Sequence, residues 1–332
     1  MDPITQGTLG AVLSQSLNNK KTLGIIGLIG FLSGLAPDLD IFIRSEKDPL
    51  LFLEFHRQFT HSLIFIPFGG FICAVCLFFL ISKRLNISFK DTWISATLGY
   101  ATHGLLDACT SYGTLLFWPF TQTRIAWNNI SIIDPLFTIP LLILIILAGF
   151  KQKKIFSIIA MIWAVSYILM GIYQKNEALK IAKTIIKERK HKEIRIDVKP
   201  SIGNLLLWKS IYETKDEFHI DAIRLGWDKK IFYGESIDKI NIQLSFPWLM
   251  LKSQQAKDIK RFNWFSNGYI AINPKNKNQI IDIRYSEIPN EIGGLWGIEL
   301  DKNKNNTEHV KYITNRNVSK DRFKILKEMI LY

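Results

Sequence analysis

Apolar segments of membrane-spanning length constrain the fold of this chain more than any other feature. A helix needs about 20 mostly apolar residues to cross a bilayer. The first half of the chain contains four segments of that length or slightly less, at residues 63–81, 92–108, 136–150 and 155–173. A fifth, at residues 23–36, is shorter and also fits a re-entrant segment. The sequence therefore predicts an α-helical polytopic membrane domain at residues 1–173, with about four or five membrane helices.

The rest of the chain has a different composition. Residues 1–173 carry 12 Lys and Arg against 9 Asp and Glu, whereas the remainder carries 30 against 20, which is +10 of the +13 net charge. We expect a charged helical connector at 174–195 and a small basic α+β domain at 196–332. The elements expected in that domain are a hairpin at 204–224, strands at 279–285 and 295–300, and helices at 247–265 and 321–331. Lys exceeds Arg and there is no Arg-rich arm, so the composition favours anionic lipid headgroups over nucleic acid as a partner.

The pair His103 and Asp107 is the feature of the sequence that most directly indicates a functional site. Residues four apart project from the same face of a helix, and this pair follows a mostly apolar window that ends at Gly99. An imidazole and a carboxylate in such a place need a strong partner, and a divalent metal is the commonest one. The spacing alone also fits a plain intrahelical hydrogen bond, so further ligands are needed to decide.

More His and Asp residues lie at the ends of the apolar segments. When the predicted spans are counted, one side of the membrane holds His103, Asp107, Asp38, Asp40, His56, His61 and Asp134. Because these residues come from separate segments, their convergence predicts a single site at the membrane surface. The alternative for Asp38 and Asp40 is a helix cap or a marker of the membrane–water boundary.

This mixture of imidazoles and carboxylates suits Zn²⁺, with Mn²⁺ and Fe²⁺ as alternatives, better than Mg²⁺ or Ca²⁺. It exceeds what one tetrahedral zinc takes, so we expect one or two ions. With an open position, such a site activates water for hydrolysis of an ester, an amide or a phosphoester. Arg57 and Arg124 are candidates for neutralising a substrate phosphate, and contact with lipid headgroups is the alternative for both. The sequence has no Gly-x-Ser-x-Gly elbow and no phosphate-binding glycine loop, which argues against a serine hydrolase and an NTPase.

Six motifs together resemble the YdjM-like family of inner-membrane metal-dependent hydrolases. In chain order they are Met-Asp-Pro-Ile-Thr-Gln at 1–6, Pro-Asp-Leu-Asp at 37–40, His-Arg-Gln-Phe-Thr-His-Ser at 56–62, Thr-His-Gly-Leu-Leu-Asp at 102–107, Thr-Ser-Tyr-Gly-Thr at 110–114 and Ile-Asp-Pro-Leu at 133–136. The resemblance covers roughly residues 1–175. The second half resembles the soluble C-terminal extension of one branch of that family.

The resemblance implies a multi-pass protein of the bacterial inner membrane. It implies that the metal ligands are Asp38, Asp40, His61, His103 and Asp107, with Asp134 or His56 acting as a base or orienting a ligand. Many family members have His where this chain has Gln6, and an amide is a poorer metal ligand. The family is also distantly similar to zinc-dependent phospholipase C enzymes, which suggests phosphoester cleavage by analogy.

We therefore predict a membrane-bound metal-dependent hydrolase that acts on a phosphoester or a related bond, for which a lipid is one candidate substrate. One alternative is a non-catalytic inner-membrane scaffold or stress-response adaptor with a structural or vestigial metal site, and another is a transporter with an intramembrane ion pathway. Eight Lys and Arg, among them Lys20 and Lys21, occupy the short loops of one side, against four on the side of the site. This bias predicts that the site and the C-terminal domain are extracytoplasmic.

Overall fold

The chain forms two compact units. The computed structural model describes residues 1–18, 22–226, 228–315 and 320–332, so Lys20 and Lys21 lie outside the described residues. Unit 1 comprises Met1–Phe42, Phe55–Tyr173 and Ile202–Leu205, and unit 2 comprises Ile43–Glu54, Gln174–Ser201 and Leu206–Tyr332.

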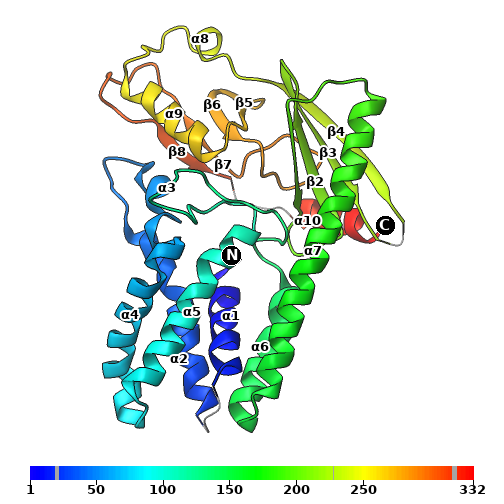
Figure 1. Cartoon of the computed structure of the whole chain (residues 1–332). Coiled ribbons are helices and arrows are strands. Elements are labelled where there is room, and N and C mark those ends of the chain that lie inside the picture. The colour runs from blue at the N-terminus through cyan, green and yellow to red at the C-terminus, as the bar shows by residue number, and fades with distance from the viewer. Residues whose placement is uncertain (19–21, 227, 316–319) are drawn as a thin grey trace. The chain divides into compact units, whose positions relative to one another are not determined.

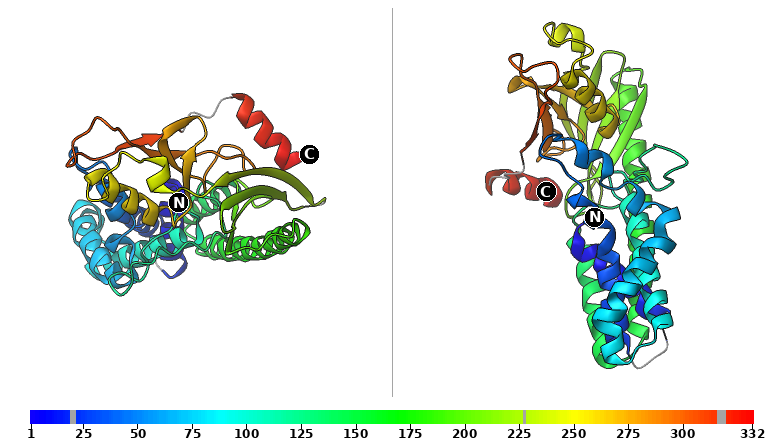
Figure 2. Two further views of the ribbon diagram at one scale, coloured as in Figure 1. Left: turned by 90° about the horizontal axis from the view of Figure 1, so that it is seen from above. Right: turned by 90° about the vertical axis from the view of Figure 1, so that its left-hand side faces the viewer.

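Unit 1 is a helical bundle. Five helices run alongside one another in both side views (Figures 1 and 2): α1 (Pro3–Ser16), α2 (Leu23–Leu35), α4 (Ile66–Leu77), α5 (Phe89–Cys109) and α6 (Pro135–Lys151). Three helical segments are long and apolar enough to cross a membrane, namely Leu23–Phe42, Leu63–Leu85 and Ile155–Glu188, and α6 is a shorter apolar helix. The predicted polytopic α-helical membrane domain is thus confirmed.

Two segments continue further than the sequence indicated. The short apolar segment at 23–36 is extended by a 3₁₀ turn, Ala36–Phe42, to a span of 20 residues. Helix α7 (Ile155–Glu188) runs without a break through most of the expected connector. No Pro or Gly lies between residues 174 and 188, so nothing in the sequence ends the helix where the charged residues begin.

Local capping residues fix where helices α1 and α6 begin. A side-chain oxygen of Asp2 accepts the Thr5 N–H at 3.0 Å, and Pro3 occupies the first turn of α1. Asp134 and Pro135 start α6 in the same way. Helices α2 and α5 then approach so closely that a Cβ on Gly99 would lie 2.3 Å from the Gly30 carbonyl oxygen. Small residues at such contacts allow the backbones of membrane helices to touch.

The non-helical segments of unit 1 are tied together by backbone hydrogen bonds. Leu115 N–H donates to the Arg57 carbonyl at 2.9 Å, and Leu63 N–H donates to the Leu116 carbonyl at 3.0 Å. Thr114 forms an antiparallel bridge with Ile125. These bonds hold the segment that contains His56 and His61 against the segment that follows α5.

Unit 2 is built from two antiparallel four-stranded sheets, which confirms the predicted α+β class. One sheet has the order β1-β2-β3-β4 and the other β5-β6-β7-β8. The strands are β1 (Arg195–Pro200), β2 (Leu207–Glu213), β3 (Glu217–Arg224), β4 (Lys230–Asp238), β5 (Ile270–Asn273), β6 (Asn276–Asp282), β7 (Trp296–Glu299) and β8 (Lys311–Thr314). An apolar core joins the sheets, with Ile211 and Ile220 from the first packed with Ile281 and Ile283 of the second.

Most elements predicted for unit 2 are present. Strands β2 and β3 form the expected hairpin, and α10 (Lys320–Leu331) matches the helix expected at its C-terminal end. Helix α9 (Gln254–Phe265) begins later than the predicted residue 247, because Ser253 caps its first turn by accepting the Ala256 N–H. A four-residue helix, α8 (Ile242–Ser245), precedes it.

The segment Ile43–Glu54 belongs to unit 2, although it lies within the range 1–173 that the sequence assigns to the membrane domain. It runs into the short helix α3 (Leu51–Phe55). Arg261 on α9 donates to both carboxylate oxygens of Asp48 at 2.9 and 2.8 Å and also pairs with Glu54. Charged contacts 207 and 213 positions apart thus attach this segment to the second unit.

Candidate metal centre

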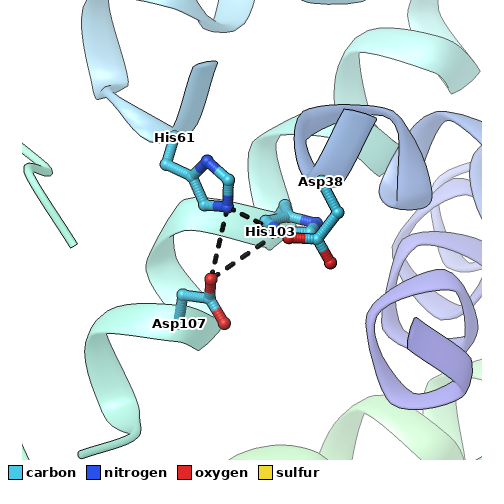
Figure 3. Close-up of side chains that lie close together, drawn as sticks. All are labelled: Asp38, His61, His103 and Asp107. Atoms are coloured by element: carbon cyan, nitrogen blue, oxygen red, sulfur yellow. Dashed lines mark ion pairs between the residues drawn. The ribbon is translucent and has the colours of Figure 1, made fainter. Parts of the chain in front are cut away.

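Four side chains of unit 1 lie close together (Figure 3). Asp38 comes from the turn after α2, His61 from the 3₁₀ turn Phe59–His61, and His103 and Asp107 from α5. The Nε2 atoms of His61 and His103 lie 3.3 and 3.7 Å from Asp107 Oδ2, and each lies 3.4 Å from Asp38 Oδ1. Tetrahedral zinc with bonds of about 2.0–2.1 Å separates its ligand atoms by about 3.3 Å. The spacing therefore fits a four-ligand zinc site.

Three ligand atoms of this cluster are buried and, among the described residues, accept or donate no hydrogen bond, although Asp107 Oδ2 also forms an ion pair with Arg57 Nε at 3.1 Å. They are His61 Nε2, His103 Nε2 and Asp107 Oδ2. Unsatisfied buried polar atoms are rare, because each costs free energy unless an ion or water completes it. Three such atoms directed at one point indicate that the cluster could hold a metal ion.

The other nitrogen of each imidazole is fixed by an acceptor. His103 Nδ1 lies 2.6 Å from the Gly34 carbonyl oxygen, and His61 Nδ1 lies 3.2 Å from Asp40 Oδ2. A proton on Nδ1 leaves the Nε2 lone pair for a metal, which is the usual arrangement of metal-binding histidines. Burial alone would lower the pKa of His61, but Asp107, Asp38 and Asp40 outweigh it and raise the pKa to about 10. The anionic surroundings thus favour a cation at this imidazole, either a proton or a metal.

Asp40 and His56 form a second group with Asp38. These three offer ligand atoms within 4.8 Å of one another. Asp40 is buried and accepts hydrogen bonds from the Arg57 N–H at 2.9 Å and the Thr60 hydroxyl at 2.7 Å, while His56 Nδ1 lies 2.7 Å from its other oxygen. Asp40 therefore contacts His61 rather than joining the four-residue cluster, and Asp38 is common to both groups.

Several cationic or amide groups surround Asp107. Arg57 Nε lies 3.1 Å from Oδ2, and Oδ1 accepts from the Gln6 amide at 2.8 Å and contacts the amine of Met1. Arg57 is buried, has a left-handed φ of 65° and stacks its guanidinium 4.6 Å from the centre of the Tyr112 ring. A bulky residue in this conformation is strained, and such strain concentrates at functional sites.

The N-terminal half of the chain matches a known family. A family model described as YdjM inner membrane protein matches residues 1–178, more than half of the chain. The chain belongs to the YdjM family. Its apolar helices agree with that description, so it is an inner membrane protein. Searches of curated proteins and of solved structures gave no match.

Two further candidate residues of the YdjM region lie outside both groups of ligand atoms. Asp134 caps α6 and accepts from the Tyr167 hydroxyl at 2.9 Å on both of its oxygens, which is a structural use of the carboxylate. Arg124 donates to the Gly113 carbonyl at 2.8 Å and lies 5.7 Å from the Tyr112 ring centre. It thus shares an aromatic neighbour with Arg57.

Sequence reasoning missed the groups that orient the ligands. Thr60 and Tyr112 lie within the motifs at 56–62 and 110–114, but no sequence signal assigned a role to either residue. The contact of His103 with the Gly34 carbonyl could not be predicted, because a backbone carbonyl leaves no mark on the residue type. Gln6 does reach the site, because its amide donates to Asp107.

Proposed function

We propose that the YdjM region is a zinc-dependent hydrolase that cleaves a phosphoester or a related bond at the membrane surface. Its metal ligands would be Asp38, His61, His103 and Asp107. The observation that supports this most directly is that ligand atoms of the four residues lie at tetrahedral spacing, with both imidazole Nε2 atoms buried and without a hydrogen bond among the described residues. The second group, with Asp40 and His56, would hold a second ion, or would orient the ligands of the first ion and accept a proton beside it.

When bound, zinc supplies Lewis acidity and lowers the pKa of a water molecule to about 7. Burial lowers the pKa of His56, against the opposing effect of Asp40, so this imidazole is neutral near pH 7 and able to accept a proton. Asp40 holds its ring by the bond to Nδ1. The guanidinium of Arg57 would orient an anionic substrate, because planar donors match phosphate oxygens.

The surroundings of Asp38 favour a lipid substrate. Its side chain is 25 % exposed, whereas those of His61, His103 and Asp107 are fully buried, so access to the cluster is from the Asp38 side. The neighbouring Leu39, Ile41 and Phe42 are 62, 51 and 70 % exposed. Apolar residues exposed around a polar site suit a substrate with hydrocarbon chains and a polar head.

We expect zinc-dependent cleavage of a phosphodiester by the purified protein, and a loss of about 100-fold in kcat/KM for Arg57→Met. Bis-p-nitrophenyl phosphate and short-chain phospholipids in detergent are the probes. Arg124→Met is the matched control, since this guanidinium already donates to a carbonyl, and it should change the rate less than threefold. Equal rates for wild type and Arg57→Met, at equal zinc content, would contradict the role of Arg57.

The burial of three of the four ligands also favours a second candidate, a scaffold with a structural metal site. In that case removal of zinc would lower the melting temperature of the protein. The zinc-loaded protein would cleave neither bis-p-nitrophenyl phosphate nor the short-chain phospholipids.

We also propose that the site and the C-terminal domain face the extracytoplasmic side, on the basis of the loop charges. Alkaline phosphatase fused after Tyr332 should then be active in cells, because this enzyme folds only after export. A fusion that is inactive, with an active cytoplasmic reporter at the same position, would reverse the orientation.

A further inference from the structure

Unit 2 contains a buried lysine that pairs with no carboxylate. Lys209 on β2 is 4 % exposed, and its ammonium contacts the Ser286 hydroxyl at 2.6 Å and the Glu291 carbonyl at 3.2 Å. Within the described part of the chain it forms no ion pair. A charged ammonium in such a place is costly, and the group reduces that cost by losing its proton.

The neighbours of Lys209 explain why it favours the neutral form. On the same face of β2, Leu207 and Ile211 belong to apolar core clusters. Across the ladder its partner on one side is Ala222 and on the other is Lys199, a second buried lysine. Burial is the main cause and the repulsion from Lys199 adds to it. The carboxylates of Asp282, Glu291 and Glu235 oppose both, and the pKa of Lys209 still falls to about 7.

Ser286 follows β6 and is partly exposed. Its hydroxyl donates to the Ile288 carbonyl at 2.7 Å and accepts from Lys209. A neutral Lys209 has a free lone pair, towards which the same hydroxyl proton can turn. Gly293 adjoins this serine, and a Cβ at that glycine would lie 3.4 Å from the Ser286 Cβ.

We propose that Ser286 and Lys209 form a serine–lysine dyad, a nucleophilic site that cleaves an acyl ester or amide. A hydroxyl becomes nucleophilic when a neighbouring base takes its proton, and a desolvated lysine is one such base. This site shares no residue with the metal centre. Lys209 and Ser286 lie 77 positions apart in sequence, so no local motif indicates the pair.

Cleavage takes place in two stages, acylation of Ser286 and hydrolysis of the acyl-serine. Ser286 Oγ bonds to the acyl carbon while its proton moves to Lys209 Nζ. The bond to the leaving group breaks, and the ammonium returns the proton to that group. Water then attacks the acyl-serine ester, Lys209 takes a proton from the water, and the proton restores the Ser286 hydroxyl as the carboxylic acid leaves.

A fluorophosphonate probe tests the proposal on the full-length protein in detergent. We expect covalent labelling located at Ser286 by mass spectrometry, unaffected by a chelator, and faster from about pH 6 to about pH 8 as Lys209 loses its proton. Ser286→Ala should abolish labelling, and Ser236→Ala, which removes an exposed serine of β4, should leave it unchanged.

The variant Lys209→Met tests whether Lys209 acts as a base or only stabilises the fold. Methionine fits the apolar face, so the melting temperature should be kept while the labelling rate falls at least about 100-fold. Gly293→Val should slow labelling by narrowing the approach to the serine. Absence of labelling in the wild type, labelling that persists in Ser286→Ala, or an unchanged rate in folded Lys209→Met would each overturn the dyad.

Discussion

Purified protein is expected to hold close to one zinc ion per chain, and the variants His103→Ala and Asp107→Ala are expected to lose it. Loss of a group that only orients a ligand costs about 10–100-fold in metal affinity, so loss of a ligand itself should exceed that range. Elemental analysis of the detergent-purified protein, after reconstitution with zinc, measures the effect directly.

Matched controls separate ligand loss from misfolding. Asp134→Asn replaces another fully buried carboxylate and retains the helix cap, and His309→Ala removes a histidine that pairs with Asp258 in unit 2. Both should keep their zinc. Metal at 100 times its dissociation constant stabilises the folded state by about 2.7 kcal/mol. A chelator should therefore lower the melting temperature of the wild type and of both controls, but not of His103→Ala. Zinc-free wild type after reconstitution would contradict the metal centre.

The fold class was predictable because its signals are local. Apolar length identifies the membrane segments, and two strand-like runs on either side of the polar stretch Thr214–Glu217 identify the β2–β3 hairpin. The attachment of Ile43–Glu54 to unit 2 was not predictable. It depends on Arg261, and no periodicity in either segment announces a contact more than 200 positions away.

The sequence could indicate that several candidate ligands lie close together, but not how they are arranged. Counting spans brought Asp38, His61, His103 and Asp107 to one side of the membrane, and the structure brings these four together. The same count could not tell that Asp40 contacts the Nδ1 atom of His61, or that Asp134 caps a helix. Those distinctions depend on side-chain directions within about 4 Å, which residue spacing alone does not determine.

Gly104→Ala is expected to damage the metal centre although it changes no ligand. A Cβ at Gly104 would lie 2.1 Å from the His61 carbonyl oxygen, far inside van der Waals contact. The obstacle is backbone and cannot rotate away, so either α5 or the turn with His61 must move. The imidazole would then leave the position from which it faces Asp107 at 3.3 Å.

Two opposing effects decide the sign of this change. Alanine favours a helix over glycine by about 1 kcal/mol, whereas forcing an extra methyl group into a packed interior costs about 1–3 kcal/mol. Since the closest atom here is a backbone oxygen, the packing cost should win. We expect a lower melting temperature together with a loss of at least about tenfold in zinc affinity.

Gly24→Ala in α2 is the matched control. Its added Cβ would lie 3.7 Å from the nearest atoms, which is ordinary contact. This variant should therefore melt at or above the wild-type temperature and keep its zinc. Thermal melting and zinc titration of both variants in one detergent provide the comparison. If Gly104→Ala binds zinc as the wild type does, the close approach of α5 to His61 is not what positions the imidazole.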